Sequence, residues 1–334
     1  MSDIQDAVRE RYAAKALVMA QGASCCDSSC CGDTGSGMND GYSATELASV
    51  GLDPTASLGC GNPALLADLR PGERVLDLGS GAGLDVLLSA RRVAPGGHAY
   101  GVDMTDEMLA VARENQAKTA VPNATFLKGT IEQIPLPDAS VDVVISNCVI
   151  NLAADKRVVL REAHRVLRPG GRFAVADMVA LAELPPDVKR SLDQWAGCVA
   201  GTISIEEYTT ALRDAGFKGV DIEITREARL DGVDGAIASA YIRARKDSVI
   251  GSLDLACSLS EAEAALRRTE WAAVEASPVE RTEREGGVEA TYRAGPELRG
   301  RLERLLELER ECCAGARWEL REEGDLLRMS ISAT

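Results

Sequence analysis

One stretch of this sequence, residues 75–85, limits the possible folds more than any other. An apolar run around Asp77 leads into Gly-Ser-Gly-Ala-Gly at residues 79–83, and apolar residues then recur at helical spacing from Leu84. The pattern predicts a buried strand, a glycine turn and the start of a helix. Glycines let the backbone approach a ligand closely, and a helix start offers free N–H groups with a partial positive charge. These residues therefore predict a site for a nucleotide-type cofactor.

Strands and helices alternate after this turn, joined by short connections. We expect an α/β fold with a doubly wound, parallel, Rossmann-like sheet that carries helices on both faces. Ligands of such sheets bind outside the carboxyl ends of the strands, where Asp103, Asn147 and Cys148 are expected. The expected strands are residues 99–102, 124–128, 141–146, 172–177, 220–225 and 236–245, and the expected helices are residues 105–118, 156–167, 185–200 and 204–215, with a stop at Arg168-Pro169-Gly170-Gly171.

Composition divides the chain into three expected parts. Residues 1–42 combine a helical pattern with a loop rich in Gly, Ser, Asp and Cys, and residues 43–246 hold the alternating strands and helices. Residues 250–334 predict a small α+β domain: a strand and a helix, then a hairpin about Gly286-Gly287, a long helix from Pro296 and a second hairpin about Glu323-Gly324-Asp325.

The charge balance restricts the partners of the protein. The formal net charge of −15 over 334 residues disfavours nucleic acid and anionic membranes, and no apolar run approaches the length of a membrane span. The N-terminus also lacks a signal-peptide pattern, so we expect a cytoplasmic protein. Ten cysteines in a cytosolic chain indicate metal, metalloid or redox chemistry rather than a disulfide framework.

The spacing of the glycines restricts the class of cofactor that the site is expected to bind. The turn reads G-x-G-x-G after Leu-Asp-Leu, an acidic residue follows about twenty residues later, and the chain then contains Gly129-Thr130-Ile131-Glu132-Gln133-Ile134-Pro135 and Leu167-Arg168-Pro169-Gly170-Gly171. This combination resembles the class I S-adenosylmethionine-dependent methyltransferases. The resemblance implies cofactor-binding roles for Asp77, Gly79, Ser80, Gly81, Gly83, Asp103, Met104, Thr130, Ile131, Glu132 and Asn147, with Asn147 facing the sulfonium side.

Cysteines stand where the methyl acceptor is expected. The chain has only two histidines, and neither His98 nor His164 is placed as a catalytic base. Cys60 precedes the cofactor strand, Cys148 follows the fourth strand, and Cys198 lies on a helix expected to cover the site. Three thiolates suit a thiophilic, three-coordinate centre, whereas the plainer alternative is three unrelated buried cysteines.

Four motifs resemble the microbial arsenite methyltransferases over about residues 1–245: Ser57-Leu58-Gly59-Cys60-Gly61-Asn62-Pro63, Leu76-Asp77-Leu78-Gly79-Ser80-Gly81-Ala82-Gly83, Ser146-Asn147-Cys148-Val149-Ile150-Asn151-Leu152 and Gly197-Cys198-Val199-Ala200-Gly201. The resemblance implies that Cys60, Cys148 and Cys198 hold trivalent arsenic, from arsenite or methylarsenite, while its lone pair attacks the methyl group of S-adenosylmethionine. It implies a role in arsenic detoxification.

The resemblance also implies a redox partner for Cys60. In the family an N-terminal cysteine pairs with the residue corresponding to Cys60, and thioredoxin or glutathione resets that disulfide. The candidates here are Cys25, Cys26, Cys30 and Cys31, with Cys30 or Cys31 preferred as nearer in sequence. The spacing of Cys26 and Cys30 also permits a zinc site, and a plain flexible tail is the third reading.

The C-terminal region departs from the basic family pattern. Cys257, Cys312 and Cys313 form a possible accessory thiol set there, or are ordinary cysteines of a packing domain. Two other functions stay open at this point. One is a methyltransferase for a small organic acceptor, and the other is a non-catalytic protein that binds or sequesters metalloid.

Overall fold

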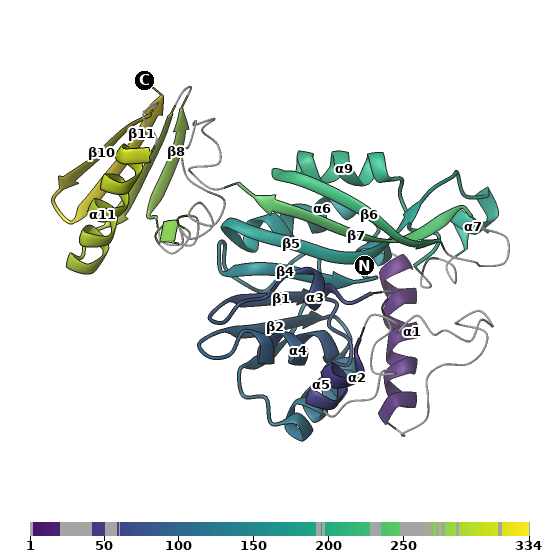
Figure 1. Ribbon diagram of the computed structural model, residues 1–334. Coiled ribbons are helices and arrows are strands. Elements are labelled where there is room, and N and C mark those ends of the chain that lie inside the picture. The colour runs from purple at the N-terminus through teal and green to yellow at the C-terminus, as the bar shows by residue number, and fades with distance from the viewer. Residues whose placement is uncertain are drawn as a thin grey trace. The chain divides into compact units, whose positions relative to one another are not determined.

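The computed structural model forms two compact units (Figure 1). One unit comprises Met1–Leu167 and Arg172–Arg245, and the other comprises Lys246–Thr334 with Arg168–Gly171. No helix in the described part of the chain is both long and apolar enough to span a membrane. The structure describes residues 3–20, 42–50, 59, 61–191, 195, 198–227, 235–247, 267, 270–271, 274, 278–284, 287–312 and 316–333.

A seven-stranded sheet forms the centre of the first unit, in the order β3-β2-β1-β4-β5-β7-β6. Its elements are α1 (Asp3–Ala20), α2 (Ala44–Val50), α3 (Pro63–Leu66), β1 (Arg74–Leu78), α4 (Leu84–Arg92), β2 (His98–Asp103), α5 (Asp106–Thr119), β3 (Ala124–Lys128), β4 (Val141–Asn147), the 3-10 helix η2 (Ile150–Leu152), α6 (Lys156–Val166), β5 (Leu167–Ala180), α7 (Pro186–Arg190), α9 (Ile205–Asp214), β6 (Phe217–Glu227) and β7 (Ile237–Lys246).

Both faces of this sheet are buried, which confirms the expected α/β class. Along β1, Leu76 and Leu78 pack into a core that α6 and α9 complete. Val75 points to the opposite face and packs with α4 and α5. Because side chains alternate across a strand, one apolar run supplies both cores. The glycine turn after β1 is thereby fixed between two helical layers.

The sheet differs from the expectation in its last strands. Strands β1 to β5 pair in parallel, but β7 pairs antiparallel with β5. A parallel pair needs a crossover of a dozen or more residues, and the connection between β6 and β7 is shorter than that. The sheet is therefore mostly, not wholly, parallel.

Two other sequence predictions need correction. The strand expected over residues 172–177 is longer, because β5 begins at Leu167, which pairs with Val141, and runs past Arg172, which pairs with Val143, to Ala180. The helix expected over residues 185–200 ends at Arg190, because Ser191 takes extended backbone angles. Cys198 lies beyond that end with a φ of +64°, which a right-handed helix does not permit.

The second unit is a four-stranded antiparallel sheet with a helix. Its order is β10-β11-β9-β8, and the expected hairpins are present. Trp271 stacks on Trp318 in its core, and the buried Glu309 accepts a hydrogen bond from the Trp271 indole at 2.8 Å. Its elements are β8 (Glu280–Arg284), β9 (Gly287–Arg293), α11 (Pro296–Cys312), β10 (Ala316–Glu323) and β11 (Leu326–Ala333).

The first prediction concerns Gly83, which begins α4 with a φ of +89°. A Cβ there would lie 2.7 Å from the Phe126 ring, whereas at Gly219, with a φ of +58°, it would meet nothing within 4 Å. Gly219→Ala should lose about 1–2 kcal/mol of unfolding free energy to backbone strain alone. Gly83→Ala should lose about 1–3 kcal/mol more through overpacking, measured by urea denaturation. Equal losses would show that Phe126 does not restrict this turn.

Candidate active site

A cavity opens at the carboxyl ends of β1, β2 and β4. Helix α1 contributes Gln5, Val8 and Tyr12 to its wall. Every residue expected to bind the cofactor lines this cavity, with the exception of Gly83. Gly83 instead starts α4 and packs against Phe126. The lining residues among those expected are Asp77, Gly79, Ser80, Gly81, Asp103, Met104, Thr130, Ile131, Glu132 and Asn147.

The glycine turn is fixed to β2 through its backbone. The N–H groups of Gly79 and Ser80 both donate to the Val102 carbonyl, at 2.8 and 3.0 Å. Asp103 accepts one hydrogen bond from the Gly81 N–H and one from the Thr105 N–H, both at 2.9 Å. The Met104 N–H and the Thr105 hydroxyl also hydrogen-bond to this carboxylate, so its position at the cavity wall is fixed.

Two further features favour a ligand at this turn. The Ser80 hydroxyl is buried and has no hydrogen-bond partner among the described residues, which leaves its donor to a bound molecule. A Cβ at Gly101 would lie 2.7 Å from that hydroxyl oxygen, so glycine is needed beneath it. The Ser80 hydroxyl is thus the donor of this turn that is left for a ligand, because the N–H groups of Gly79, Ser80 and Gly81 bond to Val102 and Asp103.

The charge of the lining residues selects the kind of ligand. Burial raises the pKa of Asp77, and the neighbouring Asp85 and Asp103 raise it further. Burial raises the pKa of Asp85 to about 6 against the hydrogen bonds from Tyr42 and Asn147, and burial also raises the pKa of Asp103. Among the described lining residues no Lys, Arg or His balances these acids. The cavity therefore suits a cationic ligand and repels the pyrophosphate of a dinucleotide.

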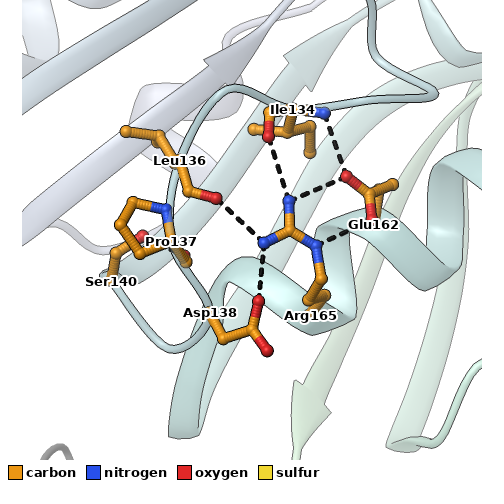
Figure 2. A network of polar contacts seen from close by, with 7 residues as sticks. All are labelled: Ile134, Leu136, Pro137, Asp138, Ser140, Glu162 and Arg165. Carbon is orange, nitrogen blue, oxygen red and sulfur yellow. Dashed lines mark hydrogen bonds and ion pairs between the residues drawn. The ribbon is translucent and has the colours of Figure 1, made fainter.

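An arginine fixes the segment that follows the Thr130–Glu132 wall (Figure 2). Arg165 of α6 donates to the carbonyls of Ile134 and Leu136 at 3.0 and 2.9 Å, and to the carboxylate of Asp138 at 2.7 Å. The carboxylate of Glu162 accepts from Arg165 and from the Ile134 N–H. Its hydrogen bond with Arg165 holds the pKa of Glu162 below its usual value. These contacts bind the loop to α6 and so keep the cavity wall in one place.

The structure brings two of the three expected cysteine ligands together. The Cys198 thiol donates to the backbone carbonyl of Cys148 at 2.8 Å, and both residues are buried in an apolar cluster with Val8 and Leu152 of the cavity wall. Cys198 is a free thiol, whereas Cys148 is disulfide-bonded. Cys60, Cys30 and Cys31 lie outside the described residues, and so do Cys25 and Cys26.

Both cysteines have unusual backbone conformations. The φ angles are +58° at Cys148 and +64° at Cys198, a region that residues with a side chain rarely adopt. A hydrogen bond of 2.8 Å from the Cys148 N–H to the Ala176 carbonyl holds the first of them. Such strain persists only where the surrounding structure enforces it, and it is concentrated at functional sites. The strain therefore indicates that the placement of these thiols matters.

The thiol of Cys198 is protonated in this environment. Burial and the nearby Asp177 raise its pKa to about 12, against a hydrogen bond with Tyr12 of α1. Burial and Cys198 in turn raise the pKa of Tyr12.

The sequence analysis did not identify Tyr12, Tyr42 and Asp85 as site residues, because the pattern predicts helices and a turn but not which side chains meet in the fold. The apolar positions of α1 were the available signal for a helix over the site.

Comparisons with known proteins agree with this geometry. A model of the methyltransferase domain family matches residues 69–216. The crystal structure of an arsenic(III) S-adenosylmethionine methyltransferase from Chlamydomonas reinhardtii is 34% identical, with a TM-score of 0.53, and the match covers 65% of this chain and 78% of that one. The chain belongs to the arsenite methyltransferase family. Within this family the fold is that of class I, S-adenosylmethionine-dependent enzymes.

Curated members of the family match over shorter shares of their length. The arsenite methyltransferase of Halobacterium salinarum is 45% identical over 66% of this chain and 59% of its own. The arsenite methyltransferase of Mus musculus is 37% identical over 48% of this chain and 47% of its own. The chain thus spans roughly half to three fifths of these curated relatives.

The second prediction is a pH dependence of cofactor binding. Because the pKa of Asp85 is about 6, its carboxylate loses its charge as the pH falls through 6, and its attraction for a cation is lost with it. The affinity for S-adenosylmethionine should therefore fall about tenfold from pH 7 to pH 5, equivalent to about 1.4 kcal/mol, measured by isothermal titration calorimetry. S-adenosylhomocysteine, which lacks the sulfonium charge, should show a weaker dependence. A flat profile for S-adenosylmethionine would contradict the role given to the acids.

Proposed function

We propose that this protein transfers the methyl group of S-adenosylmethionine to trivalent arsenic held by cysteine thiolates, as a step in arsenic detoxification. The observation that carries the proposal is the meeting of Cys148 and Cys198 beside an acidic cavity. Cys148 lies between Asn147 and Val149, which both line that cavity, and the Cys198 thiol contacts its carbonyl. A thiophilic acceptor bound there lies next to the cofactor site.

The residues of the cavity fit S-adenosylmethionine. When bound, this cofactor supplies a methyl group on a cationic sulfur. Asp77, Asp85 and Asp103 provide the negative charge that attracts such a cation, and Asp103 is the proposed partner of the ribose hydroxyls. The Ser80 hydroxyl and the Thr130–Glu132 wall complete the set proposed for cofactor binding, with Gly79, Gly81, Met104 and Asn147.

The proposed role of Cys60, Cys148 and Cys198 is to hold arsenic in a three-coordinate site. Condensation of arsenous acid with three thiols forms three As–S bonds and releases three water molecules without net release of a proton. The high pKa of Cys198 is therefore compatible with binding of the metalloid. The arsenic lone pair then forms the As–C bond while the S–CH3 bond breaks and its electron pair stays on the leaving sulfur.

A thiol reductant is the second part of the proposal. Methyl transfer formally oxidises arsenic by two electrons, and thiols, from thioredoxin or glutathione, return it to the trivalent state. Cys148 is disulfide-bonded in the structure, so it too must be reduced before it can bind arsenic. We assign the internal redox role to the N-terminal cysteines, with Cys30 or Cys31 preferred. A cytoplasmic location, where thiols stay reduced, belongs to this proposal.

The third prediction tests the ligand set. Cys148→Ser and Cys198→Ser should each lower kcat/KM for arsenite by more than about 100-fold, since each removes a sulfur ligand. Their affinity for S-adenosylmethionine should stay within about twofold, because neither cysteine lines the cavity. Products are separated by chromatography with arsenic detection after incubation with S-adenosylmethionine, arsenite and a thiol. Cys312→Ser, at the end of α11 in the other unit, is the matched control.

Two outcomes of this experiment would favour a function other than arsenite methylation. Full arsenite turnover in both variants would favour an organic acceptor and incidental cysteines. Arsenite binding without any S-adenosylhomocysteine formation would favour a non-catalytic protein that sequesters metalloid.

The fourth prediction concerns the redox role of the N-terminal cysteines. Joint replacement of Cys25, Cys26, Cys30 and Cys31 by serine should slow multiple turnovers of arsenite about tenfold, because the internal reductant is lost. A single turnover that starts from the fully reduced enzyme should be unchanged. Rapid-quench assays measure the single-turnover rate with a limiting amount of arsenite and the multiple-turnover rate with an excess. Normal rates over many turnovers would refute the redox role.

The C-terminal unit has no assigned part in this chemistry. We propose residues 43–246 as the methyltransferase domain, residues 1–42 as its N-terminal redox segment and residues 250–334 as an accessory domain. Cys257 and Cys313 of the possible accessory thiol set lie outside the described residues, and Cys312 ends α11.

A further inference from the structure

The side chain of Asn147 holds the backbone of Gly61. Its amide N–H group donates to the Gly61 carbonyl at 2.8 Å, and its amide oxygen accepts from the Gly61 N–H at 3.2 Å. The two bonds reproduce the pairing that a neighbouring strand would make. Gly61 follows Cys60 directly in the chain, and Asn147 directly precedes Cys148. One side chain therefore joins the two segments that carry these cysteines.

The glycines on either side of Cys60 permit this close approach. A Cβ at Gly59 would lie 2.0 Å from the side-chain carbon of Asn147. A Cβ at Gly61 would lie 2.8 Å from the Ala176 side chain and 2.9 Å from the Tyr241 ring. Side chains at either position would push the segment away from the end of β4. The Gly-Cys-Gly sequence is thus explained by packing against Asn147 and its neighbours.

Tyr42 extends this contact to the cavity wall. Its hydroxyl accepts from the Asn147 amide at 3.0 Å and donates to the carboxylate of Asp85, at 2.8 and 2.9 Å from the two oxygens. The Asn147 amide also approaches Asp85 directly, at 3.3 Å. Tyr42 is 8% exposed and is not among the residues that line the cavity, whereas Asp85 is. A buried network of this kind specifies one arrangement of its members.

We propose that Asn147 and Tyr42 are positioning residues that hold Gly61, the residue that follows Cys60 in the chain, against the end of β4 next to Cys148. The Asn147 amide donors are directed at Gly61, Tyr42 and Asp85, so this side chain holds the Gly61 segment in addition to lining the cavity. The consequence for arsenic rests on the proposed function, whereas the positioning itself does not. Loss of the network releases Gly61 from the end of β4, and we expect it to weaken any ligand that bridges Cys60 and Cys148.

The test measures thiol proximity without arsenic. The reduced full-length protein is treated with dibromobimane, which bridges neighbouring thiols, and the Cys60–Cys148 bridge is quantified by peptide mass spectrometry against a urea-unfolded sample. The bridge should form well above that baseline in the unaltered protein, and about tenfold less in Tyr42→Phe and Asn147→Ala. Tyr100→Phe, which removes a hydroxyl from β2 outside the network, should bridge normally.

A second measurement distinguishes the loss of this positioning from general damage to the fold. Tyr42→Phe should keep its affinity for S-adenosylhomocysteine, which carries no sulfonium charge for Asp85 to attract, within about twofold, and should raise KM for arsenite about 10- to 100-fold. Bridging at the unaltered level in both Tyr42→Phe and Asn147→Ala would overturn the proposal, as would a baseline signal in the unaltered protein. If bridging responds as expected but no arsenite is methylated, the proposed function fails and the positioning role stands.

Discussion

Buried negative charge around the glycine turn is the constraint on which this protein depends. Asp77, Asp85 and Asp103 share one cavity, and burial raises the pKa of each. The described lining residues include no base, and Arg92 outside the lining lowers the pKa of Asp85 only in part, so the free protein carries desolvated carboxylates whose charge is incompletely balanced. A cationic cofactor removes this cost on binding. The acids thus lower the stability of the empty site and raise the affinity of the filled one.

The positions of the two thiols depend on backbone conformation and not on buried charge. Cys148 and Cys198 both have left-handed backbone angles, which cost about 1–2 kcal/mol each for residues with a Cβ. Hydrogen bonds from the Cys148 N–H to Ala176 and from the Cys198 thiol to the Cys148 carbonyl hold these conformations. Backbone geometry, more than side-chain rotamers, therefore decides where the sulfur atoms lie. Rigid thiols favour a ligand of fixed geometry over a flexible organic acceptor.

Much of this could be predicted from sequence, because it depends on local pattern. The position of Asp103 at a strand end follows from alternating strands and helices, whereas the cavity wall at Thr130–Glu132 was implied by the resemblance to class I methyltransferases. The contacts of Tyr42 could not be found in this way, since its partner Asn147 is 105 positions distant. The placement of Cys198 on a helix was wrong for a related reason. Its positive φ accompanies a tertiary contact with Cys148 and has no signal in the periodicity of residues 185–200.

The same carboxylates also affect how readily the demethylated cofactor is released. In the reaction that we propose, methyl transfer removes the positive charge from the sulfur of the cofactor, whereas Asp77, Asp85 and Asp103 stay in place. The attraction that favours binding therefore weakens once the reaction has taken place, and it weakens most where the pH keeps these carboxylates ionised. An uncharged sulfur beside ionised carboxylates is released more readily than the cation it replaces. The arrangement thus favours turnover as well as binding, because a single charge on the cofactor distinguishes substrate from product.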